Sequence, residues 1–179
     1  DGTWHVYISG TGSASIRGTR RCRDPKNSVL ISDSDPVRLY LDGSLKIGAD
    51  IWIDTTDINH AADFMILGTP ISTTTRRQNT LQIRGESPNG EALKAFIWLP
   101  NGKVRFDISR RNDHLVEGAI WSKSFWIDGN SRLGEFELRL PENMPQMIYQ
   151  RLGREFGIGQ RDYVAQGVTR WSSYARRSD

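Results

Sequence analysis

Few residues in this 179-residue chain have the types and spacing that metal binding requires. The densest group of carboxylates is formed by Asp50, Asp54, Asp57 and Asp63, with His60 beside them. Calcium loops need oxygen ligands at the close spacing of an EF-hand or of glycine-aspartate repeats, and this group has neither spacing. We therefore expect no metal site and no cofactor, and we expect His60 to be solvated in a loop.

Catalytic candidates are equally sparse. Hydrolysis of a glycosidic bond needs a paired acid and base, and Asp128 with Glu117 or Glu135 is the best pair that the sequence offers. These acids fall at turns and strand ends, where acidic residues are common. Cys22 lies among arginines that could lower the pKa of its thiol, but His5 is the only base near it in the sequence. We therefore predict a protein that is not an enzyme.

Tryptophan is unusually frequent, with six residues. Four of them lie in segments whose apolar residues alternate: Trp52, Trp98, Trp121 and Trp126. If the apolar side of such a segment faces a core, Ile97 and Leu99 point away from Trp98. An exposed row of tryptophans would stack against sugar rings or nucleobases. The interpretation that we favour is that a helix or an N-terminal hairpin covers them, because soluble proteins rarely expose large apolar patches.

Positive charge gathers in arginine clusters. The net charge is +3 and the pI is about 9.2, values that are ordinary for a soluble surface. Contacts with DNA or with a surface polysaccharide therefore stay an alternative that the charge does not establish. The candidate ligand or partner surface comprises Arg76, Arg77, Arg110, Arg111, Trp52, Trp98 and Trp126.

The segments that must position these residues alternate apolar and polar side chains with the period of two that a strand requires. They are separated by corners at Gly43, Gly68, Gly85, Gly102 and Ser124, which are about 17 to 25 residues apart. Such a spacing is typical of the rungs of a β-solenoid. Antiparallel hairpins use the same Asp-Gly and Asn-Gly turns, so a sandwich or meander stays open. We predict a mainly β fold built on a short parallel β-solenoid.

The expected organisation is a single domain spanning residues 1–179. Residues 1–36 are predicted to form an N-terminal β-hairpin region, and residues 37–130 the repeating β core. Residues 131–179 are predicted to form a C-terminal cap with one short amphipathic helix at 146–156, which Gly157 ends. We expect this helix to cover an end or a side of the coil.

Four segments in this order carry a resemblance to a known family: VRLYLDG (37–43), TLQIRG (80–85), KAFIWLPNGKV (94–104) and EGAIWSKSF (117–125). The chain thereby resembles the C-terminal domain of PilX-type type IV pilus assembly proteins. In that family the segments "lyvdGdi", "lqiyg", "aaiYAPnadv" and "GaivgksitlnG" follow one another at similar distances. YISGTG (7–12) and TRWSS (169–173) resemble the flanking segments. The chain departs from the pattern at Trp98-Leu99, where Tyr-Ala is usual, and it lacks an acidic "YDE" segment after Asn130.

The resemblance implies the soluble head of a minor pilin, a non-enzymatic protein of the bacterial cell surface. Its partners would be other pilin subunits and DNA or a surface polysaccharide, and its role would be pilus assembly, adhesion or DNA uptake. The only membrane contact implied is through a hydrophobic N-terminal helix upstream of Asp1. A secreted carbohydrate-binding β-solenoid module is the alternative, and a polysaccharide lyase or hydrolase ranks third.

Overall fold

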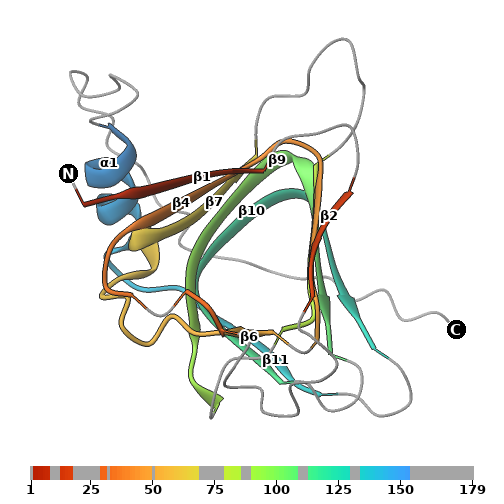
Figure 1. Ribbon diagram of the computed structural model, residues 1–179. Helices are drawn as coiled ribbons and strands as arrows, with labels where there is room; N and C mark the ends of the chain where they lie inside the picture. Colours follow the sequence, from red (N-terminus) through yellow and green to blue (C-terminus); the bar gives the residue numbers. More distant parts are fainter. Residues whose placement is uncertain are drawn as a thin grey trace, which may run out of the picture.

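The structure, a computed structural model, describes residues 2–8, 13–17, 29–31, 33–49, 51–68, 79–85, 90–108, 113–129 and 134–153. Within these ranges the chain winds as a coil of parallel strands with a roughly triangular outline (Figure 1). All strand pairs of the described residues are parallel. The predicted short parallel β-solenoid is therefore confirmed.

Two long sides of the coil, here named face A and face B, carry most of the strands. Face A contains β1 (Trp4–Ile8), β4 (Val37–Leu41), β7 (Phe64–Gly68) and the first halves of β9 (Leu93–Asp107) and β10 (His114–Asp128). Face B contains β2 (Ser13–Ile16), β5 (Ser44–Ile47), β8 (Thr80–Ile83) and the second halves of β9 and β10. The third side carries the short pair β3 (Val29–Leu30) and β6 (Trp52–Ile53), and β11 (Phe136–Arg139) pairs with the start of β10.

The core lies inside the coil because every second side chain of each strand points inward. On face A the inward column includes Leu39, Ile66 and Ile97, and on face B it includes Leu81 and Val104. All five are at most 5 % exposed. Since each rung contributes one row of apolar side chains, stacking the rungs produces the buried core.

Glycines stand where the chain turns or passes close to another rung. Gly43, between β4 and β5, has a φ of 114°, a conformation that other residues rarely adopt. The predicted corners at Gly43 and Gly102 both lie between face A and face B, whereas Gly85 follows β8 at the far end of face B. The sequence placed Gly85 in the same row of corners as Gly43 and Gly102, and this is wrong. Gly85 packs closely against the Ile51 carbonyl at the other end of face B.

A 3-10 helix η2 (Ala61–Asp63) and the helix α1 (Met144–Gly153) cover part of the outer surface of face A. Pro145 falls in the first turn of α1, where the missing N–H costs nothing. Met144 packs there against Ala61 and Met65, and Arg151 forms a 2.7 Å ion pair with the buried Asp63. The expectation that the helix covers a side of the coil is confirmed (Figure 1). In the described part of the chain no helix is long and apolar enough to cross a membrane.

The predicted N-terminal β-hairpin is wrong. β1 pairs with β4 and β2 pairs with β5, both in parallel, so the two segments form the first rung of the coil. Alternation followed by a glycine-rich break is common to a hairpin and to a solenoid corner. The partner strand lies one rung further along the chain, and local sequence carries no information about it.

Candidate functional site

The outer surface of face A carries a column of large side chains that lie in register on successive strands. We name it the aromatic column: Tyr7, Tyr40, Leu67, Trp98 and Trp121. Neighbouring strands lie about 4.8 Å apart, so the column spans about 19 Å. Tyr7, Trp98 and Trp121 are 70 %, 39 % and 66 % exposed, whereas Leu67 is buried between the two aromatic groups.

One end of this column is ordered by ring contacts. Tyr7 and Tyr40 stack with their ring centroids 4.6 Å apart and their planes 9° from parallel. His5, on the same strand as Tyr7, also stacks with Tyr40, with the ring centroids 5.9 Å apart, and its Nδ1 lies 3.2 Å from the Tyr40 hydroxyl. This end of the column therefore combines apolar ring faces with polar atoms, an arrangement that suits a ligand with both apolar and hydrogen-bonding surfaces.

A signal for this column was present in the sequence and was missed. Each residue of the column is the fourth of a five-residue stretch: WHVYI, VRLYL, FMILG, AFIWL and GAIWS. Aligning these stretches would have placed Tyr7 and Tyr40 beside Trp98 and Trp121. The sequence interpretation considered tryptophans only.

Face B has a different outer surface, which is basic and polar. Its strands present Lys46, Gln82, Arg105 and Trp126 in one register column, with Thr80, Lys103 and Ser124 in the next. A shallow depression of about 390 Å³ lies over the last rungs of this face. Its lining residues are Thr80, Lys103, Arg105, Trp126 and Asp128.

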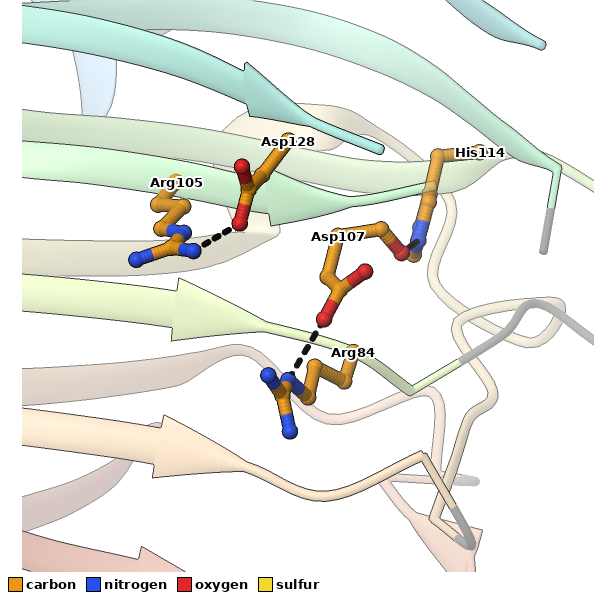
Figure 2. Close-up of polar contacts among 5 residues, drawn as sticks. All are labelled: Arg84, Arg105, Asp107, His114 and Asp128. Atoms are coloured by element: carbon orange, nitrogen blue, oxygen red, sulfur yellow. Dashed lines mark hydrogen bonds and ion pairs between the residues drawn. The ribbon is translucent and has the colours of Figure 1, made fainter. Parts of the chain in front are cut away.

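Ion pairs fix the corner of face B next to this depression (Figure 2). Arg105 pairs with Asp128, and both side chains are about half exposed. Arg84 Nε lies 2.6 Å from a carboxylate oxygen of Asp107, which is buried. Arg105 and Trp126 are register partners on β9 and β10, and both line the depression.

His114 lies behind this corner and is buried. Its Nε2 is 3.2 Å from the backbone oxygen of Asp107, and its ring meets Phe106 edge-on at 5.4 Å. Burial lowers the pKa of His114 below the ordinary value, and the contact with the Asp107 carbonyl opposes this shift only in part. His114 is therefore neutral at pH 7 and serves the packing of the corner.

The tryptophans that the sequence singled out do not form one row. Trp98 lies on the outer surface of face A, Trp126 on that of face B, and Trp52 on the third side, where it is half-buried. Trp121 is the only one of them next to Trp98 in register. The expectation that these tryptophans are covered is wrong for Trp98, Trp121 and Trp126, which are exposed. The cluster around α1 contains Met65 and Phe96 and, from the aromatic column, Leu67 with Tyr40 packed against it, but none of these tryptophans.

The carboxylate candidates do not converge. Glu117 and Asp128 lie near opposite ends of β10, and Asp63 is paired with Arg151. The described residues contain no group of three or more His, Cys, Asp or Glu side chains that could hold a metal ion.

His60 is not simply solvated, because its ring has a structural role. Its Nδ1 accepts a hydrogen bond from the Ala62 N–H and caps η2, while Nε2 lies 3.0 Å from Asn143 Oδ1. The residues Arg76, Arg77, Arg110, Arg111, Cys22 and Asp50 lie outside the described residues.

Comparison of the chain with known protein families, with curated proteins and with solved structures found no match.

Proposed function

We propose that this chain is the binding head of a minor-pilin-like protein of a type IV pilus system at the bacterial cell surface. It acts in adhesion and in contacts with other pilin subunits, without catalysis. The observation that carries the adhesion role is the aromatic column, whose two ends carry exposed rings, Tyr7 at one end and Trp98 with Trp121 at the other.

The column suits the apolar faces of sugar rings. Aromatic side chains stack on such faces, and their polar atoms reach hydroxyl groups at the edge. Ile97 and Leu99, the strand neighbours of Trp98, are fully buried, so the indole is held on a backbone that the core fixes. A ligand would therefore bind to rings whose positions are set beforehand, which lowers the entropy cost of binding.

The pilin assignment is supported by how the four resembling segments fall in the coil. They occupy β4, β8, β9 and β10; β9 pairs with both β8 and β10, and β7 lies between β4 and β9. Gly43 and Gly118, which lie in two of these segments, both have a positive φ, a backbone conformation that favours glycine. The glycine positions of the family pattern are thus consistent with the backbone of this coil, which supports the proposed assignment.

The adhesion role is tested by co-sedimentation of the purified chain with insoluble neutral polysaccharides, cellulose and chitin. The double variant Trp98→Ala/Trp121→Ala is expected to bind at least about tenfold more weakly, since each stacked ring contributes about 1–3 kcal/mol. Tyr149→Ala is the matched control, because this exposed ring lies on α1 outside the column. Equal binding by the double variant and the control would contradict the adhesion role of the column.

The pilus association is tested separately, in cells that carry the full-length gene. The protein is expected in the surface fraction released by shearing, and it should be missing from that fraction in cells without the pilus assembly ATPase. Release of the protein into the medium independent of that ATPase would contradict the pilin assignment.

A secreted carbohydrate-binding module is the second candidate. It is favoured by Trp126, a 62 % exposed ring on face B that lies beside Lys103 and Arg105. Such a module would need no pilus, so the ATPase-independent release described above is the outcome that it predicts.

A further inference from the structure

We propose that the outer surface of face B is a separate site for an acidic polysaccharide, with a sugar ring on Trp126 and uronate carboxylates on Lys103, Arg105 and Lys46. This site does not use the aromatic column, which lies on face A, and it does not depend on the pilus assignment.

The register places these groups in a continuous surface. Trp126, Arg105 and Gln82 follow one another on adjacent strands, and Lys46 is the next residue of the same column. Since strands lie about 4.8 Å apart, Lys46 is about 10 Å along the column from Arg105. A polysaccharide laid across the strands would therefore meet the indole ring first and then two cations separated by one amide side chain.

The chemistry of the depression favours a sugar polymer over a nucleic acid. Within the described residues, Lys46 and Lys103 have no ion-pair partner, so both ammonium groups can receive a carboxylate. Thr80, Gln82 and Asp128 supply the hydroxyl, amide and carboxylate groups that bind sugar hydroxyls. Trp126 is the one aromatic ring among the described lining residues, so single-stranded DNA would find little to stack on.

The site is tested by calorimetric titration of the purified chain with polygalacturonate at low and at physiological salt. Lys103→Gln and Trp126→Ala are each expected to weaken binding about tenfold, the effect of losing one charge-assisted contact or one stacked ring. Arg139→Gln is the matched control, because it removes one positive charge from β11, outside face B. Both site residues are exposed, and the melting temperature of each variant checks that the coil is intact.

Two results would overturn the proposal: an equal loss of affinity in Lys103→Gln and Arg139→Gln, which would mean that only net charge matters, or no binding of polygalacturonate at low salt. Tighter binding of an oligothymidylate, lost in the same site variants, would replace the polysaccharide by a nucleic acid. The Trp98→Ala/Trp121→Ala variant is expected to bind polygalacturonate normally, so failure at one face is distinguishable from failure at the other.

Discussion

Replacing Gly118 by alanine tests the packing that brings the last rung onto the coil. Gly118 opens the stretch of β10 that carries Trp121, and it pairs in register with Ala95 of β9. Its φ is 154°, and a Cβ atom there would lie 1.8 Å from the Ala95 carbonyl oxygen. No side chain fits at this distance, so the two rungs would have to separate locally.

The expected loss of stability can be divided into two parts. Backbone strain at positive φ costs about 1–2 kcal/mol for a residue with a Cβ atom. Displacing the Ala95 carbonyl disturbs the β9–β10 ladder and the core beneath it, which adds about 2–3 kcal/mol. We therefore expect Gly118→Ala to lower the free energy of unfolding by about 3–5 kcal/mol, a large part of the 5–15 kcal/mol typical of a domain.

Gly90→Ala is the matched control, because Gly90 also has a positive φ, 75°, but nothing lies within 4 Å of the added Cβ. It should show the strain alone, about 1–2 kcal/mol. Urea unfolding followed by far-UV circular dichroism measures both variants. If the two differ by less than about 0.5 kcal/mol, the close approach of β10 to β9 is refuted.

Three further predictions concern the corner, the ion pairs and the two sides of face A. Because the pKa of His114 is lowered in the folded protein, the unfolded state binds the proton more readily. The free energy of unfolding should therefore be at its full value above the unfolded pKa of about 6.5 and should fall as the pH drops below it. Urea titrations at pH 7 and pH 5 should show a smaller fall in the variant His114→Gln. Asp63→Ala should lower the free energy of unfolding by about 1–3 kcal/mol, less than the loss of a fully buried ion pair, because its partner Arg151 is partly exposed. Glu137→Ala, which removes an exposed ion pair, should leave the urea midpoint of unfolding unchanged. Ile97→Ala should cost about 2–4 kcal/mol through an internal cavity, and Trp98→Ala on the opposite side of the same strand should change stability far less, both measured by thermal unfolding.

The candidate site was predictable from the sequence only in part. Alternation correctly placed Ile97 inside and Trp98 outside, since successive side chains of a strand point to opposite sides. It did not assign Trp98 and Trp126 to different faces, because the corner between them lies within the single long strand β9 and its neighbour β10. The sequence did not group Lys103 and Arg105 with Lys46 and Trp126 on face B, because Lys46 and Trp126 come from other rungs.

The amino-acid sequence by itself determined the strand-rich composition, the inward and outward sides of each strand, and the presence of one short amphipathic helix. These properties depend on neighbours within a few residues, which a period or a turn residue reveals. Only the tertiary structure decided that the first two segments form a rung, not a hairpin, that Gly85 belongs to another corner, and that Tyr7 lies in one column with Trp121. Each of these depends on the register between strands that are far apart in the chain, and register follows from packing the rungs on a common core.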